Sequence, residues 1–364
     1  MEALKDPDPK VRSASAEALG FFPNHSDDVK KALIAVLNDP DVSPRRAAVL
    51  ALGRVGERDH SVEELVKKYL DDPDKQTQMN ATIAMALLGT WNDTEIPILA
   101  EALGNKNEST AKGASKALSM IGEQNPEKVI PVLVEALDSK TPVAAVHALP
   151  ALKKLKKHAG EALPKIIAMY EKSDEDTRSD ILDAVSAIDE SGDFAVPICL
   201  KALHEDNPLD RREALIALMR FRAKAPTFFD SLVEELKDKD VENRLLALGL
   251  IRGLGPDLGK AAPEIIQLLT DPDMRVRNSS ISTLGSIKSP PAEVLEALQK
   301  AFNDRDYRTR VAAVNALRVI GKSEPERITP ILEQALSSES YDPVKRLITA
   351  ALEELKNTSV ATKP

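Results

Sequence analysis

The stretch "LTDPDMRVRNSSISTLGSI" occupies residues 269–287, and "LKDKDVENRLLALGLIRGL" occupies residues 236–254. The two stretches begin 33 residues apart and share one skeleton. Each has a leucine, then a short turn rich in aspartate, an arginine eight residues after the leucine, and an aliphatic residue fifteen residues after it. A period of this length is typical of repeat proteins, so we expect further copies along the chain.

The repeat runs through the whole sequence. We call the apolar residue just before each turn the anchor of its copy, and anchors recur every 33 residues in eight of ten intervals and every 34 in the other two. The anchors are Leu4, Leu37, Leu70, Leu103, Leu137, Tyr170, Leu203, Leu236, Leu269, Phe302 and Leu336. Alanine stands fourteen residues after most anchors, an aliphatic residue follows, and another apolar residue comes three positions later. Spacings of three and four place these side chains on one helical face, which we expect to be buried.

A second amphipathic segment precedes the anchor, as in "PEKVIPVLVEAL" (126–137). Proline recurs six residues before several anchors, where we expect the first turn of a helix. The turn reads "DPD" at 6–8, 39–41 and 271–273, and its aspartate is expected to cap the following helix, as Thr141 is before Pro142. These patterns predict an all-α protein: a right-handed α-solenoid (α-α superhelix) of about eleven 33-residue helix-turn-helix repeats.

The array is expected to span residues 1–356, with 357–364 as a short disordered tail. The first copy begins three residues before its anchor, so it lacks most of its first helix. We therefore expect either that the chain is part of a longer polypeptide or that this end docks against another surface.

Composition excludes several classes of protein. The single cysteine excludes an internal disulfide framework and a cysteine-based zinc cluster. The acidic start lacks the apolar region of a signal peptide, and no apolar run approaches the roughly 18 residues of a membrane span. We therefore expect a soluble, cytoplasmic chain without membrane contacts. The net charge of -9 argues against general binding to nucleic acid or anionic lipid.

The phrases "DPDPKVRSASAEALG" (6–20), "DPDVSPRRAAVLALGRVG" (39–56) and "DRDYRTRVAAVNALRVIG" (304–321) resemble the HEAT-repeat family, in particular its bacterial-type, phycobilisome-lyase-like repeats. The resemblance implies an α-solenoid over essentially the whole chain. It says little about function, because this repeat serves scaffolds, transport receptors, lyases and nucleic-acid enzymes. Ankyrin repeats have the same period, but their "TPLH" turn is absent.

A basic residue stands eight residues after most anchors, and most copies have an aspartate four residues before it. The basic residues are Arg12, Arg45, Arg178, Arg211, Arg244, Arg277, Arg310 and, in the shifted last copy, Lys345. The family resemblance implies a ladder of aspartate–arginine pairs that joins neighbouring copies. The alternative is an arginine stripe that binds phosphates, but the acids would neutralise it and few aromatic residues are present to stack on bases.

The ladder lapses in three consecutive copies, where Gln78, Ala111 and Ala145 replace the basic residue. Residues 106–172 contain 11 Lys or Arg against 7 Asp or Glu. We predict a docking patch for an acidic protein partner here, with solvated lysines as the alternative. Pro150 should kink its helix. The patch consists of Lys112, Lys116, Lys153, Lys154, Lys156 and Lys157.

Catalytic, cofactor-binding and metal-binding residues are not predicted, and no cofactor is expected. The five histidines fall at unrelated repeat positions. HEAT-like deoxyhypusine hydroxylases resemble this fold and bind iron through His-Glu pairs at the start of second helices, where this chain has pairs such as Arg212 and Glu213. Cys199 takes a position that is leucine in other copies, so we expect it to be buried.

These observations favour a non-enzymatic scaffold that binds a protein partner on the concave face, lined by the second helices. One alternative is a HEAT-like lyase subunit or chaperone for a chromophore-carrying protein. Another is a nucleic-acid-binding HEAT-like protein, which the net acidity and the low aromatic content disfavour.

Overall fold

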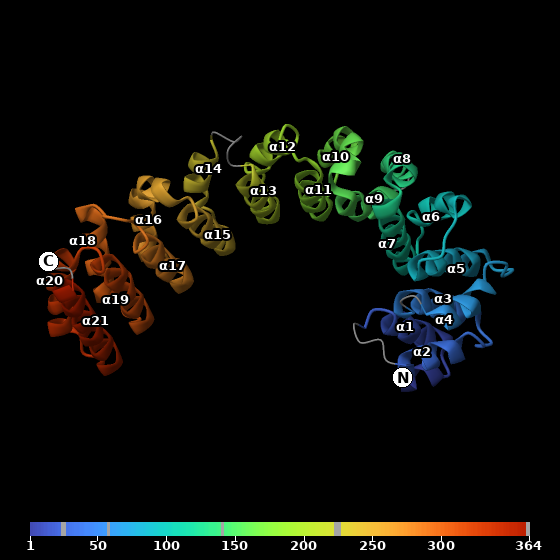
Figure 1. Ribbon diagram of the computed structural model, residues 1–364, viewed down its shortest axis with the longest axis horizontal. Coiled ribbons are helices and arrows are strands. Elements are labelled where there is room, and N and C mark those ends of the chain that lie inside the picture. The colour runs from blue at the N-terminus through green and yellow to red at the C-terminus, as the bar shows by residue number, and fades with distance from the viewer. Residues whose placement is uncertain (23–26, 57–58, 140–141, 222–226, 362–364) are drawn as a thin grey trace. The chain divides into compact units, whose positions relative to one another are not determined.

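The computed structural model describes residues 1–22, 27–56, 59–139, 142–221 and 227–361. The chain forms two compact units, unit 1 (Met1–Ile198) and unit 2 (Cys199–Pro364). Across the described ranges all regular structure is helical, and strands are absent. Within each unit the helices form two layers (Figure 1). The predicted all-α solenoid is confirmed.

Each copy contributes a first helix before its anchor and a second helix after its turn. The first helices are η1 (Glu2–Lys5), α2 (Asp27–Val36), α4 (His60–Lys67), α6 (Ile96–Ala102), α8 (Pro126–Leu137), α10 (Leu163–Tyr170), α12 (Ala195–Ala202), α14 (Phe228–Glu235), α16 (Ala262–Gln267), α18 (Ala292–Lys300) and α20 (Pro325–Ser338). The second helices are α1 (Pro9–Leu19), α3 (Val42–Val55), α5 (Lys75–Leu88), α7 (Glu108–Gln124), α9 (Pro142–Leu155), α11 (Glu175–Ile188), α13 (Pro208–Arg220), α15 (Val241–Arg252), α17 (Met274–Leu284), α19 (Tyr307–Gly321) and α21 (Asp342–Ala361). Short 3-10 turns are η2 (Asp93–Glu95), η3 (Lys156–Ala162), η4 (Gly255–Ala261), η5 (Leu268–Thr270) and η6 (Ala301–Asn303).

The turn aspartates start the second helices. Asp8 accepts a hydrogen bond from the N–H of Lys10, and Asp273 accepts one from Arg275, which satisfies donors that a helix start leaves open. Asp41 stands at the same place before α3 but makes no such bond. Thr141, the cap expected for α9, lies outside the described residues.

The alanine fourteen residues after the anchor lies where second helices meet. Ala51 and Ala84 are fully buried. A Cβ added to Gly53 would lie 2.4 Å from the Cα of Ala84, so the backbones of α3 and α5 nearly touch. Ala18 of copy 1 is exposed, because this side of α1 has no preceding second helix against it. The predicted buried face is confirmed in the later copies.

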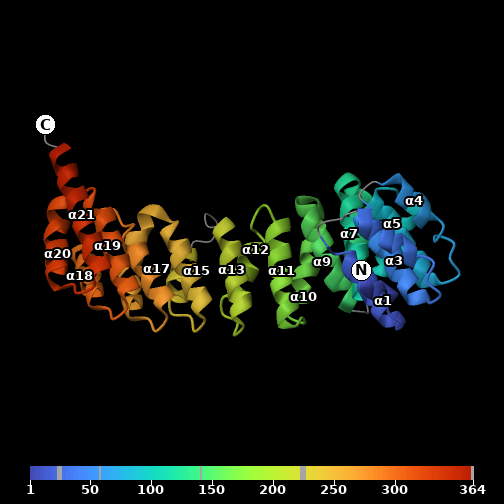
Figure 2. The same ribbon diagram turned by 90° about the horizontal axis from the view of Figure 1, so that it is seen from below.

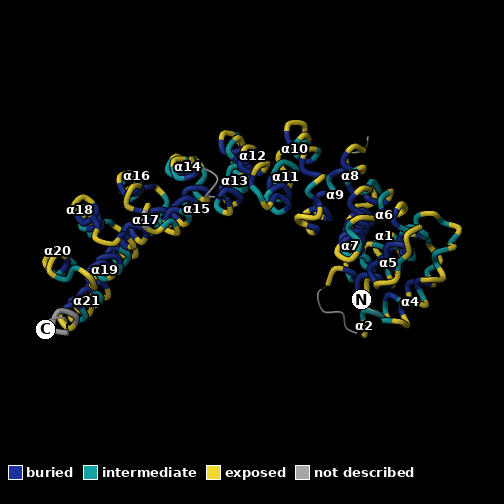
Figure 3. Tube along the Cα trace, turned by 45° about the horizontal axis from the view of Figure 1, so that its top comes forward, coloured by how far each residue is buried: buried dark blue, intermediate teal, exposed yellow. Residues whose placement is uncertain are grey.

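In unit 2 the second helices α15, α17 and α19 lie side by side in one row (Figure 2). Buried residues are common along α17 and α19, whereas exposed residues are common on α16 and α18 (Figure 3). The core of the unit therefore lies between the two layers and between neighbouring second helices, as expected for a solenoid.

Helices α9 and α21 bear on two local predictions. Helix α9 runs from Pro142 to Leu155 with Pro150 inside it, and the chain leaves this helix at Lys156, which has a left-handed φ of 51°. Helix α21 continues to Ala361 and so enters the stretch 357–364 that we expected to be a disordered tail. Residues 344–361 contain neither proline nor glycine, so no residue in the stretch stops the helix.

Candidate protein-interaction surface

The arginines eight residues after the anchors join neighbouring copies. Arg12 donates from Nε to Asp39 of the next copy at 2.7 Å, and from Nη1 to the carbonyl oxygen of Asp6 in its own turn at 2.7 Å. The guanidinium holds the pKa of Asp39 below its usual value. The same link between consecutive copies recurs in Arg211–Asp238, Arg244–Asp271, Arg277–Asp304 and Arg310–Glu339.

The ladder is therefore confirmed, but the acids that recur in it differ from those expected. They stand two or three residues after the next anchor, at Asp39, Asp238, Asp271, Asp304 and Glu339. Of the expected acids, Asp41 is ion-paired with Arg12 at 2.8 Å, whereas Asp8, Asp240, Asp273 and Asp306 cap their own helices. The arginine side chains are mostly buried, with Arg244 only 9% exposed. A buried, paired guanidinium is not available to phosphates, so the ladder is a structural joint.

Neutral hydrogen bonds replace the ladder between α5 and α7. Asn105 donates to Gln76 at 2.9 Å, and Thr110 donates to Asn80 at 3.0 Å. Asn80 in turn donates to the carbonyl oxygen of Arg46 at 3.0 Å. Between copies 3 and 4, the lapse predicted from the sequence is therefore a change from a charged link to an uncharged one.

The second-helix face of copies 2 and 3 is closed. Leu50 of α3 is 2% exposed and Ile83 of α5 is fully buried, and a Cβ added to Gly113 of α7 would lie within 3.2 Å of both. Arg54 reaches from α3 to α7, where it donates to Ser109 Oγ at 2.9 Å and to the Ser109 carbonyl oxygen at 2.7 Å. Three second helices thus converge, and the side chains of Leu50 and Ile83 are not accessible to a partner.

Further contacts hold this closure together. Phe21 of copy 1 covers the guanidinium of Arg54, with the carbon Cζ 4.1 Å from the ring centre. Asn107 of copy 4 donates to Glu17 of copy 1 at 3.3 Å, across 90 residues of chain. Burial lowers the pKa of Arg54 to about 10, so it remains protonated at neutral pH. The expectation that every second helix lines an open concave face is therefore wrong for these copies.

The face opens again at α7 and α9. Pro150 stands thirteen residues after its anchor, as Leu50 and Ile83 do, yet it is exposed. All six lysines of the predicted patch are exposed, on α7, α9 and η3. Lys154 is ion-paired with Glu123 at 3.3 Å, so the ends of α7 and α9 lie together.

The lysine patch is neither compact nor wholly free. Lys112 is near the start of α7 and is ion-paired with Glu108 at 2.5 Å, whereas Lys153 is near the end of α9 and is ion-paired with Asp183. Lys116, Lys156 and Lys157 are exposed, and within the described part of the chain no carboxylate forms an ion pair with them. These three lysines are therefore the members of the patch whose charge is free to pair with an acidic partner.

Helix α11 presents acids beside the lysines, which the sequence interpretation missed. Asp176, Asp180 and Asp183 are spaced by four and three residues, so they share one face of α11. Partial desolvation first, and then the neighbouring Asp183 and Asp176, raise the pKa of Asp180, although its side of α11 is exposed and Lys153 lowers the pKa. The signal was present in the sequence, because residues 173–198 contain eight acidic residues and one arginine.

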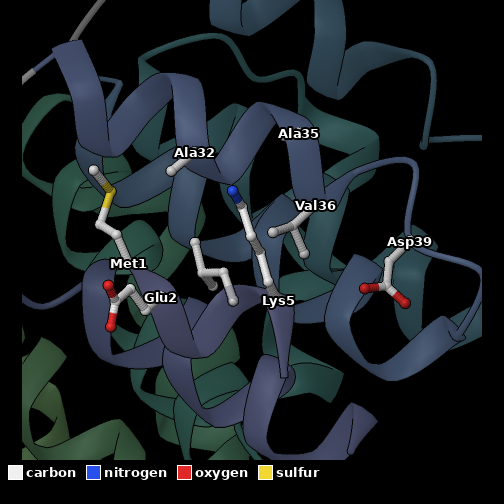
Figure 4. Close-up of a pocket in the computed structure, with 8 residues that line it drawn as sticks. Met1, Glu2, Lys5, Ala32, Ala35, Val36 and Asp39 are labelled. Atoms are coloured by element: carbon white, nitrogen blue, oxygen red, sulfur yellow. The ribbon is translucent and has the colours of Figure 1, made fainter. Parts of the chain in front are cut away.

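A hollow lies at the start of unit 1, between η1 and α2 (Figure 4). It measures about 710 Å³ and is lined by Met1, Leu4, Ala32, Ala35 and Val36, among others. Phe22, at a repeat position that is mostly buried in other copies, is 57% exposed. Apolar side chains are therefore accessible both beside η1 and α2 and at Phe22.

Reactive side chains do not gather in the described part of the chain. No three His, Cys, Asp or Glu residues there could hold a metal ion. Cys199 is fully buried, as predicted, and burial raises the pKa of its thiol to about 12, so the thiolate is scarce at neutral pH. No described helix has the length and apolar character needed to cross a membrane.

Solved structures with the same fold are large helical arrays. A crystal structure of importin beta in an ammonium sulfate condition has a TM-score of 0.60 and 14% identity, and covers 98% of this chain and 57% of that chain. A homology model of the full-length AP-3 complex in an intermediate open conformation has a TM-score of 0.62 and 14% identity, covering 95% and 72%. A crystal structure of Kap121p has a TM-score of 0.51 and 14% identity, covering 98% and 46%. This chain thus spans about half the length of Kap121p.

No curated protein matches the sequence. A family model described as HEAT repeats matches residues 1–86, 62–153 and 229–295. The matched residues make up more than half of the 364, and they include the arginine ladder of copy 1 and the closed face of copies 2 and 3. The chain belongs to the HEAT-repeat family.

Proposed function

We propose that this protein is a non-enzymatic scaffold, which holds an acidic segment of a partner protein against the second-helix face of unit 1 formed by α7 and α9. The observation that carries the proposal is the change in this face along the unit. Leu50 and Ile83 are buried in copies 2 and 3, whereas Lys116 and Pro150, at the same repeat position in copies 4 and 5, are exposed.

Charge supports an acidic partner. Unit 1 contains 24 basic and 33 acidic residues, so its net charge is negative. A positively charged surface can therefore exist only where lysines or arginines cluster. Lys116, Lys156 and Lys157 are exposed on or next to α7 and α9. Exposed charges act over about 8 Å at physiological ionic strength, so they mainly steer association.

The first test combines photo-crosslinking with charge reversal. A photo-crosslinking residue at position 116 or 150 is expected to capture the partner, whereas one at Lys67, on the first helix α4, is not. The triple reversal Lys116→Glu, Lys156→Glu and Lys157→Glu should slow association about tenfold or more and leave the melting temperature unchanged, because these residues are exposed.

The matched control reverses three exposed lysines in or directly after first helices, Lys31, Lys67 and Lys68. It changes the net charge equally but leaves α7 and α9 untouched. Equal slowing by both triple variants would mean that only net charge matters. Capture at position 67 but not at 116 or 150 would place the partner on the first-helix layer and contradict the proposal.

A further inference from the structure

The helices α7, α9 and α11 differ in charge at equivalent positions. Thirteen residues after the anchor stand Lys116 on α7, Pro150 on α9 and Asp183 on α11. Neighbouring second helices are in contact from α7 to α9 and from α9 to α11. One row across the three helices therefore runs from basic through apolar to acidic.

Nearer the turns, exposed residues of the three helices differ in the same sense, although not all of them stand at equivalent repeat positions. Lys112 is exposed on α7, Val143 is 40% exposed on α9, and Asp176 and Asp180 are exposed on α11. Val143 and Asp176 both stand six residues after their anchors. From its start to Pro150, α9 thus exposes the apolar Val143 and Pro150 between lysines of α7, the basic edge, and acids of α11, the acidic edge. The last turn of α9, in contrast, is basic at Lys153 and Lys154.

The acidic edge carries charge that the protein does not neutralise. Asp183 is ion-paired with Lys153 of α9, but no cation of the described residues forms an ion pair with Asp176 or Asp180. Partial desolvation first, then the Asp183 carboxylate and more weakly that of Asp176, raise the pKa of Asp180, whereas the charge of Lys153 lowers it. Like charges three or four residues apart on a helix repel each other, and a cation of a partner would offset this repulsion.

We propose that this face binds one polypeptide segment in a fixed direction, with the segment's carboxylates over α7, its apolar side chains over α9 and its Lys or Arg side chains over α11. The proposal rests on the proposed function and adds the basic end of the segment and its orientation. Helices pack about 10 Å apart, so three helices span about 20 Å. An α-helical segment of about 13 residues covers that distance.

The test uses three synthetic helical peptides of about 16 residues and the full chain. The block peptide has glutamate in its first third, apolar residues in its middle and lysine in its last third. The scrambled peptide has the same composition with alternating charges, and the acidic peptide has glutamine in place of lysine. The block peptide is expected to bind about tenfold tighter than either other peptide, because only it matches both edges.

Two variants assign that preference to α11. Asp176→Asn with Asp180→Asn should abolish the advantage of the block peptide over the acidic peptide, without weakening the acidic peptide. The control, Glu127→Gln with Glu135→Gln, removes two exposed acids of the first helix α8 and should preserve the advantage.

The outcomes separate this inference from the proposed function. If the acidic peptide binds as tightly as the block peptide, the basic edge still serves an acidic partner but the directional segment is wrong. Equal binding of the block and scrambled peptides would likewise overturn it. If no peptide binds at millimolar concentration, or the lysine reversals leave all binding unchanged, both proposals fail.

Discussion

At the scale of single residues, Glu235 shows how a repeat joint can depend on pH. Its side chain lies at the end of α14 and is 8% exposed, next to Asp238, which accepts hydrogen bonds from Arg211 at 2.7 and 2.8 Å. Burial first, and then the neighbouring Asp238 carboxylate, raise the pKa of Glu235 to about 8 from 4.5. Arg211 thus pairs with Asp238, and Glu235 remains protonated at neutral pH.

The raised pKa fixes the sign of the pH dependence. Between about pH 4.5 and 8 the folded state holds a proton on Glu235 that the unfolded state has released, so the free energy of unfolding falls as pH rises through this window, by at most about 1.4 kcal/mol per pH unit. Glu235→Gln should remove this fall, measured by urea unfolding at several pH values. Glu234→Gln changes an exposed neighbour and should keep the wild-type slope; if both variants keep it, Glu235 is ionised in the folded protein.

At the scale of helices, glycine decides how closely the second helices approach. Gly53 faces Ala84, where an added Cβ would lie 2.4 Å from Cα and 2.5 Å from Cβ. Gly249 of α15 has no atom within 4 Å of an added Cβ. Both glycines stand within second helices, so replacing either with alanine raises helix propensity equally. Comparing the two variants therefore isolates the effect of packing, which differs between the two positions.

Gly53→Ala should destabilise the protein by about 1–3 kcal/mol, because the backbones of α3 and α5 must separate. Gly249→Ala should stabilise it by about 0.5–1 kcal/mol, because alanine favours a helix and meets open space. Chemical denaturation of each variant measures the difference. Stabilisation by both changes would mean that α3 and α5 are not in close contact through Gly53.

The sequence predicted what depends on local spacing. The 33-residue register places the buried alanines and the ladder arginines correctly, because helical periodicity and the repeat fix which face each side chain takes. It did not identify Asp39 as the partner of Arg12, which lies 27 residues further on, because that pairing depends on how one copy stacks on the next. Nor could periodicity reveal the contact of Asn107 with Glu17, since it depends on the twist accumulated over several copies.

The lysine patch illustrates the same limit. The sequence located the positive charge of copies 4 and 5, and the structure shows these lysines exposed. It did not show that Lys153 faces Asp183, because nearest neighbours across a stack are about one period apart in sequence.

The prolines show that local patterns also have limits for locating helix starts. Pro97 is in the first turn of α6 as predicted, but Pro131 is inside α8, which begins earlier at Pro126.

At the scale of the whole chain, the two units differ in charge. Unit 1 carries the entire net charge of -9, since unit 2 contains 25 basic and 25 acidic residues. In a repeat array each copy contacts mainly its neighbours, so stability is approximately a sum of local contributions and damage need not spread to the far end. The division into units therefore predicts that local destabilisation remains within one unit.

Leu248→Ala and Leu52→Ala test this prediction in the full chain. Both leucines are fully buried in second helices, Leu248 in α15 of unit 2 and Leu52 in α3 of unit 1. Each change should cost about 2–5 kcal/mol, which corresponds to at least a tenfold rise in amide hydrogen exchange through local opening. For Leu248→Ala we expect faster exchange in α13, α15 and α17 and unchanged exchange in α3 and α5, with the reverse for Leu52→Ala. If either substitution accelerates exchange equally in α3 and α15, the copies unfold as one cooperative body, and the free energy of each joint cannot be treated as local.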